Sequence, residues 1–80
     1  MDQTKTGGLI RALRTQKGLT QKELAEAVGV GDKAVSKWER GLGCPDVSLL
    51  PELSRVLGVW LEALLSGQID ANDQERGNMK

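Results

Sequence analysis

The sequence predicts an all-α fold, a compact bundle of five short helices. Apolar residues recur at spacings of three and four in several short segments, which is the pattern of helices that bury one side. Glycine or proline separates these segments, and nowhere do β-branched and polar residues alternate as in a half-buried strand. Hydrophobic residues make up 39% of the 80 residues and include neither Phe nor Tyr. The core must therefore consist of Leu, Val, Ile and Ala around two Trp, in a chain long enough for one domain.

The first helix is expected between residues 7 and 17, and Gly18 ends it. Its inward side consists of aliphatic residues: Leu9, Ile10 and Leu13. The residues before it are expected to form a loose lead-in, with Thr6 as the N-cap. Gly7 and Gly8 then occupy the first turn, where each costs about 1 kcal/mol relative to Ala. Fraying of this first turn is therefore expected.

The second helix has the best-defined boundaries in the sequence. Thr20 and Glu23 form a capping box, in which each side chain accepts a hydrogen bond from the backbone of the other residue. The helix therefore begins directly after Thr20. Gly29 ends it, because a helix end often places one residue at positive φ, where only glycine is free of strain. The third helix is expected over about 31–39 with Gly31 in the cap position, so only a tight turn separates the two helices.

Helices two and three each have one apolar side and one polar side. Their inward residues are apolar and helically spaced: Leu24, Ala25, Val28, Val30, Val35 and Trp38. The outward residues of the third helix are polar and mostly basic: Asp32, Lys33, Ser36, Lys37 and Arg40. Ala25 is small enough to let one helix cross closely over the other. Two crossed helices with such an outer face have a shape that suits the major groove of DNA.

A fourth helix is expected over 49–57 with Ser48 as its cap. Pro51 has no N–H and is tolerated only in a first turn, so the helix must begin late. With Asp46 as the cap, Pro51 would lie at the fifth helical position and break the helix. The inward residues are again aliphatic: Leu49, Leu50, Leu53, Val56 and Leu57.

The fifth helix is expected over 60–66, and Gly67 ends it. Its inward residues are expected to be leucines: Leu61, Leu64 and Leu65. Trp60 leaves two interpretations open, an exposed dimer contact or packing over the fourth helix. The domain then covers residues 1–67. Residues 68–80 contain almost no apolar side chains, which predicts a disordered polar tail or a linker.

Charge is distributed unevenly along a chain whose formal net charge is zero. Residues 1–40 carry eight Lys or Arg against five Asp or Glu, whereas residues 41–80 carry three against six. The positive half of the chain contains helices two and three, as expected of a surface that faces nucleic acid.

Composition excludes several classes of function. There is no His and only one Cys, Cys44, so neither an internal disulfide nor a metal cluster is expected, and Cys44 is interpreted as a small loop residue. No apolar run approaches the ~18 residues of a membrane span, and no secretory signal is recognised, so the cytoplasm is the expected compartment. No set of catalytic groups and no phosphate-binding glycine loop is present, so we expect neither an enzyme nor a cofactor.

A twenty-residue helix-turn-helix pattern has its first, fifth, ninth, fifteenth and eighteenth places filled by Gln21, Ala25, Gly29, Val35 and Trp38. The flanks match as well, with IRALR at 10–14, WERG at 38–41 and LPELSRVLGV at 50–59. Over roughly residues 8–66 the chain resembles the Cro/C1 or XRE-type DNA-binding domain of bacterial and phage transcription regulators. The resemblance implies sequence-specific binding of double-stranded DNA, repression more often than activation, and a homodimer on a pseudo-palindromic site.

The resemblance also implies roles for individual residues. Base contacts in the major groove are expected from the outer side of the third helix: Asp32, Lys33, Ser36 and Lys37. Phosphate contacts are expected from residues at helix ends: Gln21, Arg40 and Gly41. For the lysines the competing interpretation is an ordinary solvated surface. Asp32 could accept a hydrogen bond from cytosine or could serve only the helix dipole. Arg14 and Glu39 match a partly buried structural ion pair of the family.

Two other functions stay open at this point. The same bundle could bind a protein partner, as antitoxin-type relatives do, and DNA binding would then be secondary. The zero net charge and Asp32 favour that interpretation, whereas the lysines and the uneven charge distribution oppose it. Alternatively, the chain could be the DNA-binding head of a longer regulator, because it ends in a polar stretch of the kind that joins domains.

Overall fold

The computed structural model describes residues 1–68. Its helices, in chain order, are α1 (Gln3–Gln16), α2 (Gln21–Val28), α3 (Asp32–Glu39), the short 3-10 helix η1 (Val47–Leu49), α4 (Leu50–Leu57) and α5 (Leu61–Ser66). Residues 1–68 contain no strand, and the predicted all-α bundle of five α-helices is confirmed. Within the same residues, no helix has both the length and the apolar character needed to cross a membrane. Apart from Gln68, the tail predicted over 68–80 lies outside the described residues.

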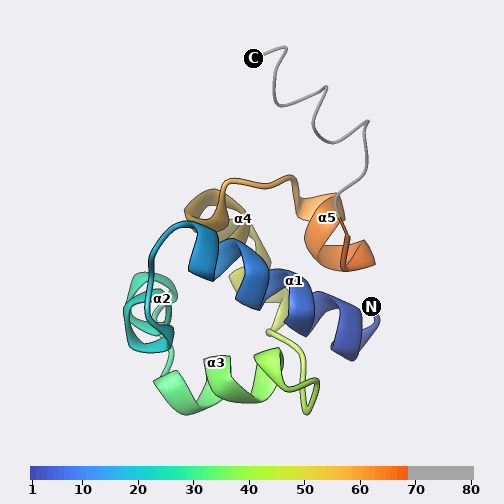
Figure 1. Ribbon diagram of the computed structural model, residues 1–80. Coiled ribbons are helices and arrows are strands. Elements are labelled where there is room, and N and C mark those ends of the chain that lie inside the picture. The colour runs from blue at the N-terminus through green and yellow to red at the C-terminus, as the bar shows by residue number, and fades with distance from the viewer. Residues whose placement is uncertain (69–80) are drawn as a thin grey trace.

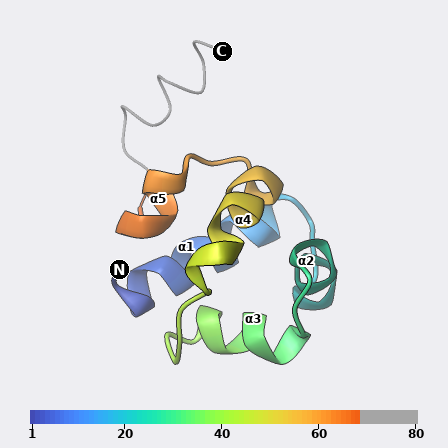
Figure 2. The same ribbon diagram turned by 180° about the vertical axis from the view of Figure 1, so that it is seen from behind.

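Helix α1 is the central element of the bundle. Figures 1 and 2 show α1 between α3 on one side and α5 on the other, with α2 at the end of the bundle where α1 finishes. Both α3, from the middle of the chain, and α5, the last described helix, pack against α1.

The core is a single cluster of aliphatic side chains around one tryptophan. Its members are Ile10, Leu13, Leu24, Ala25, Val28, Val35, Trp38, Leu50, Leu53, Leu57 and Leu64. Trp38 is 6% exposed, so its assignment to the core is confirmed. The inward sides predicted for the second, third and fourth helices all contribute to this cluster or pack against it.

Helix α1 begins earlier than expected. Asp2 is its N-cap, and the Asp2 Oδ1 accepts a hydrogen bond from the Lys5 backbone N–H at 3.0 Å. Thr6 is therefore not the cap, and the lead-in predicted before it is wrong for residues 3–6. Instead Thr6 is buried inside the helix, where its hydroxyl donates to the backbone oxygen of Leu64 at 2.9 Å. Docking on α5 thus orders a segment that has little helical signal of its own.

Gly7 and Gly8 lie inside α1, so the prediction that they form its first turn is wrong. Gly7 is buried, and a Cβ built on it would lie 1.9 Å from the backbone oxygen of Trp38. Gly8 faces open space. Gly7 therefore permits close packing of α1 on the end of α3, and this packing offsets the poor helix propensity of glycine.

Local signals define α2 as predicted. The Glu23 N–H donates to Thr20 Oγ1 at 3.0 Å, and the Thr20 N–H donates to Glu23 Oε1 at 2.8 Å, so the capping box is confirmed. Gly29 ends the helix at φ 79°, in the left-handed region. Gly31 precedes α3 and has no side chain with which to cap it.

The start of α4 is late, as Pro51 requires, but its cap differs from the prediction. Asp46 caps η1, and its Oδ1 accepts from both the backbone N–H and the hydroxyl of Ser48 at 2.9 Å. Ser48 is therefore not the cap of α4. The 3-10 turn lets the chain enter α4 at Leu50, with Pro51 as its second residue.

Helix α5 buries a different side from the one expected. Leu61 and Leu65 are 38% and 45% exposed, so the prediction that they face inward is wrong. Ala63 and Leu64 are fully buried instead. The short helix α5, six residues long, contacts α1 at this point, where the backbone oxygen of Leu64 accepts a hydrogen bond from Thr6. Trp60 is half-buried in the cap position of α5.

Candidate nucleic-acid interface

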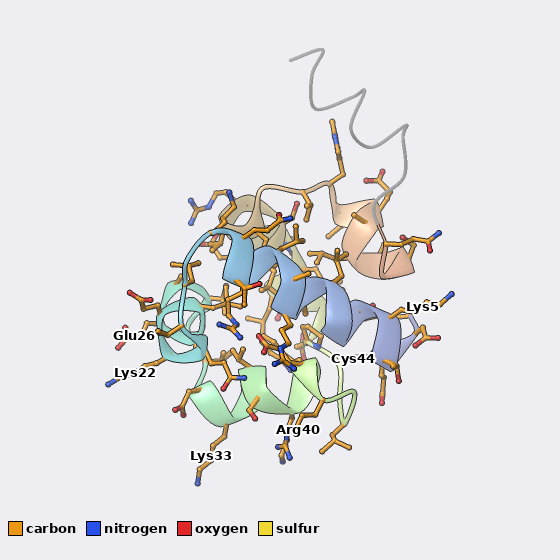
Figure 3. All side chains as sticks on the ribbon, in the orientation of Figure 1. Lys5, Lys22, Glu26, Lys33, Arg40 and Cys44 are labelled. Carbon is orange, nitrogen blue, oxygen red and sulfur yellow. The ribbon has the colours of Figure 1, made fainter. Side chains whose placement is uncertain are left out.

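Helix α3 lies at the edge of the bundle with one side in the core and the other in solvent. Val35 and Trp38 anchor its inner side. The residues predicted to contact bases lie on the remaining surface, where Asp32, Lys33 and Lys37 are exposed and Ser36 is half-buried. In Figure 3, Lys33 and Arg40 point from α3 in the same direction, away from the bundle. This outer side is convex and accessible, as a helix that enters a groove must be.

The charges on α3 favour an anionic partner. Asp32 lies in the first turn, where a carboxylate is stabilised by the unpaired N–H groups of the helix start. Two exposed basic residues of the helix follow it, Lys33 and Lys37, and the exposed Arg40 is the C-cap. Lys22, in the first turn of α2, is also exposed and points away from the bundle (Figure 3). Lys22 was not among the site residues predicted from the sequence, and it lies two positions after the cap residue Thr20.

The end of α3 is held by contacts within the chain. The Arg40 Nε donates to the backbone oxygen of Ser36 at 3.2 Å, so the side chain of Arg40 lies along the last turn. Gly41, also predicted to contact a phosphate, donates its N–H to the Trp38 backbone oxygen at 3.0 Å. Thr4 of α1 lies against Gly41. Arg40 remains accessible to a phosphate, whereas the N–H of Gly41 is already used in the fold.

Arg14 and Glu39 are brought together as an ion pair between α1 and α3. The Arg14 Nε lies 2.6 Å from Glu39 Oε2, and Arg14 Nη2 lies 3.1 Å from Glu39 Oε1. The side chains are 12% and 3% exposed, respectively. Arg14 Nη1 also donates to the backbone oxygen of Leu19 at 2.7 Å, which ties the loop before α2 to the same group.

Gln21 is a third member of this cluster, and its contact with Glu39 was not predicted from the sequence. Gln21, the first residue of α2, donates through its Nε2 to Glu39 Oε1 at 3.0 Å. Burial alone would raise the pKa of Glu39, but the hydrogen bonds from Arg14 and Gln21 outweigh burial and hold that pKa below its ordinary value. Glu39 is therefore ionised at neutral pH. No local pattern could have revealed the bond to Gln21, because the two residues lie 18 positions apart on different helices.

Further features of the chain are its only cysteine, Cys44, and its potential metal ligands. Cys44 is half-buried in the loop between α3 and η1, as expected for a small loop residue. Within residues 1–68, no group of His, Cys, Asp and Glu side chains is arranged to hold a metal ion.

Comparison with known proteins agrees with this geometry. A family model described as Helix-turn-helix matches residues 10–64, more than half of the chain. The chain is 40% identical over 74 residues to the HTH-type transcriptional activator BcrR of Enterococcus faecalis, a match that covers 89% of this chain and 36% of the activator. It is 36% identical over 61 residues to the SPbeta prophage-derived uncharacterized HTH-type transcriptional regulator YonR of Bacillus subtilis, covering 76% of this chain and 56% of that regulator. The chain thus spans about a third of the first relative and just over half of the second.

A solved structure shares the fold. The P22 c2 repressor protein, crystallised in complex with a synthetic operator, superposes with a TM-score of 0.74 at 36% sequence identity. The superposition covers 79% of this chain and 96% of the repressor chain. The similarity therefore extends through nearly all of the repressor chain in that crystal structure.

Proposed function

The chain belongs to the Cro/C1-type helix-turn-helix family of transcription regulators, and from this premise we propose that it binds double-stranded DNA sequence-specifically to control transcription. The observation that carries the proposal is the geometry of α3. Its apolar side is held in the core by Val35 and Trp38, while Lys33, Lys37 and the C-cap residue Arg40 are accessible. Such a helix can enter the major groove without any loss of core packing.

In the proposed complex, α3 reads bases and the neighbouring helix ends set the register. Lys33 and Lys37 donate to the O6 and N7 atoms of guanine, and Ser36 donates to a base or a phosphate. Asp32 accepts from a cytosine amino group or acts only on the helix dipole. Gln21 and Arg40 bind phosphates on either side of the groove, and we add Lys22 to this set.

We propose that two copies bind together. The eight residues of α3 can contact only a few base pairs. So few contacts cannot make specific binding much tighter than non-specific binding. Two copies related by a two-fold axis would read two half-sites about 34 Å apart on one side of the duplex. The operator is therefore proposed to be pseudo-palindromic. We further propose that the bound protein represses transcription by occupying this site.

We also propose that the chain is a binding module and not an enzyme, as the family membership supports. The alternative of a protein-interaction module predicts a different result in the same experiment. If the bundle only bound a protein partner, the charged side of α3 would show no preference among DNA sequences.

Selection from a random duplex pool, read by sequencing, tests the proposal. The expected result is enrichment of one pseudo-palindromic sequence. Fluorescence anisotropy should then show at least about 10³-fold tighter binding to that site than to a scrambled duplex of the same composition. Equal affinity for the two duplexes, or no enrichment, would overturn sequence-specific binding.

A further inference from the structure

We propose that Glu39 is a positioning residue for DNA binding, which holds the side chain of Gln21 in the orientation that a phosphate requires. This inference rests on the proposed function, and in particular on the contact between Gln21 and the DNA backbone. It gives the Arg14–Glu39 ion pair a role in affinity beyond its role in the fold.

The carboxylate of Glu39 has a fixed place before Gln21 contacts it. Arg14 binds both of its oxygens, at 2.6 and 3.1 Å, and Arg14 is itself held by the Leu19 backbone oxygen at 2.7 Å. Only 3% of the Glu39 side chain is exposed, so neighbouring atoms also confine it. A planar guanidinium that binds a carboxylate through two parallel bonds sets its orientation as well as its distance.

This carboxylate selects one orientation of the Gln21 amide. An ionised carboxylate can only accept hydrogen bonds, so it must face the nitrogen of the amide and not the oxygen. The structure has that orientation, with Gln21 Nε2 at 3.0 Å from Glu39 Oε1. The same nitrogen carries a second N–H, which points about 120° away and remains available for another acceptor.

A DNA phosphate requires the same orientation of the Gln21 amide as the Glu39 carboxylate does. Its oxygens also only accept, so a Gln side chain must present its nitrogen to bind one. Because Glu39 already holds the nitrogen in place, Gln21 has little rotamer freedom left to lose when DNA binds. Glu39 is the last residue of α3 and Gln21 the first of α2, so the bond also ties the base-reading helix to the phosphate anchor.

A double-mutant cycle on DNA affinity tests this coupling. In Glu39→Gln the single amide oxygen goes to Arg14, and the new amide nitrogen faces Gln21 Nε2, donor against donor. We expect this change to weaken binding to the selected site about two- to tenfold, the cost of ordering one long side chain at an interface. In a Gln21→Ala background, Glu39→Gln should cause no further loss. The same fold-loss in both backgrounds would overturn the proposal.

Thr6→Val is the matched control for stability. It removes the hydrogen bond from Thr6 to Leu64 and so loosens the bundle, at a place remote from α2. Its DNA affinity, measured at a temperature where every variant is folded, should equal that of the unsubstituted chain. If Thr6→Val weakens binding as much as Glu39→Gln does, the effect of Glu39 is general loosening and the proposal fails.

A measurement on the unsubstituted protein tests the proposal without depending on the folding of any variant. NMR relaxation of side-chain NH₂ groups, without DNA, should give an order parameter for Gln21 close to that of the backbone. Gln16 is exposed at the end of α1 and provides the comparison, with an expected value well below that of Gln21. Equal mobility of Gln21 and Gln16 would overturn the proposal. If the unsubstituted chain instead bound selected and scrambled duplexes equally, the proposed function itself would fail.

Discussion

Gly7 of α1 lies against the backbone oxygen of Trp38 so closely that a Cβ on the glycine would approach that oxygen to 1.9 Å. Glycine at this position therefore determines how near α1 comes to the last turn of α3. Since α3 carries the proposed base contacts, the packing of α1 at Gly7 positions the helix that is proposed to read the bases.

Gly7→Ala should destabilise the protein by about 1–3 kcal/mol, because the added methyl group overpacks a backbone contact that cannot move alone. Gly8→Ala is the matched control, since Gly8 lies in the same helix and faces open space. There the better helix propensity of Ala should stabilise by about 0.5–1 kcal/mol. Urea unfolding measures both. Stabilisation of equal size by the two substitutions would contradict the close approach of α1 and α3.

Glu39→Ala should destabilise by about 3 kcal/mol or more, because it leaves the guanidinium of Arg14 largely buried without its partner. The double variant with Arg14→Ala should lose less than the sum of the two single variants. Glu52→Ala, which breaks the exposed pair with Arg55, is the control and should change stability little. Strict additivity of the Arg14 and Glu39 substitutions would show that the pair contributes no coupling.

Stability should fall as the pH is lowered below neutrality, and part of the fall should come from Glu39. The folded protein holds the pKa of Glu39 below its ordinary value of 4.5, so between the two values the unfolded chain binds more protons than the folded protein. The contribution of Glu39 is thus complete above the unfolded pKa and is lost as the pH falls through the folded pKa.

Urea unfolding over a pH series from about 7 to about 3 measures this dependence. The Glu39→Gln variant has no carboxyl group at this position, so its stability should change less steeply over the acid range. Identical pH dependence of the variant and the unsubstituted chain would mean that Glu39 titrates alike in the folded and unfolded states.

Lys37→Ala should weaken binding to the selected site by about 1–3 kcal/mol and relax the preference at one base-pair position. Binding to a scrambled duplex should change less. Fluorescence anisotropy on both duplexes measures the difference. Lys17→Ala is the control, since it removes the same charge from a side chain that lies against Gly58 at the end of α4. An equal loss on both duplexes for Lys37→Ala would mean that Lys37 binds a phosphate and not a base.

Gln21→Ala should instead weaken binding to every sequence by a similar factor. Because Gln21 is neutral, the slope of log affinity against log salt concentration should stay almost unchanged, whereas loss of a phosphate-bound Lys lowers that slope by about one. Lys22→Ala provides this comparison in the same helix turn. A sequence-dependent loss for Gln21→Ala would place its side chain at a base.

Elements whose signals lie within a few residues of one another could be predicted from the amino-acid sequence. The capping box of Thr20 and Glu23 and the late start of α4 at Pro51 depend only on neighbours along the chain. The helical spacing of Val35 and Trp38 likewise separated the inner side of α3 from its outer side. The side of α3 that faces solvent could therefore be predicted from the sequence.

Contacts between distant parts of the chain could not be predicted in this way, because they depend on how the helices pack. Thr6 is ordered by Leu64, 58 positions away, and Gln21 is bonded to Glu39, 18 positions away. No local propensity encodes these two contacts, because they form only when α1 packs on α5 and α2 packs on α3. For the same reason Gly7 lies buried inside α1, since close packing against α3 outweighs the low intrinsic helix propensity of glycine.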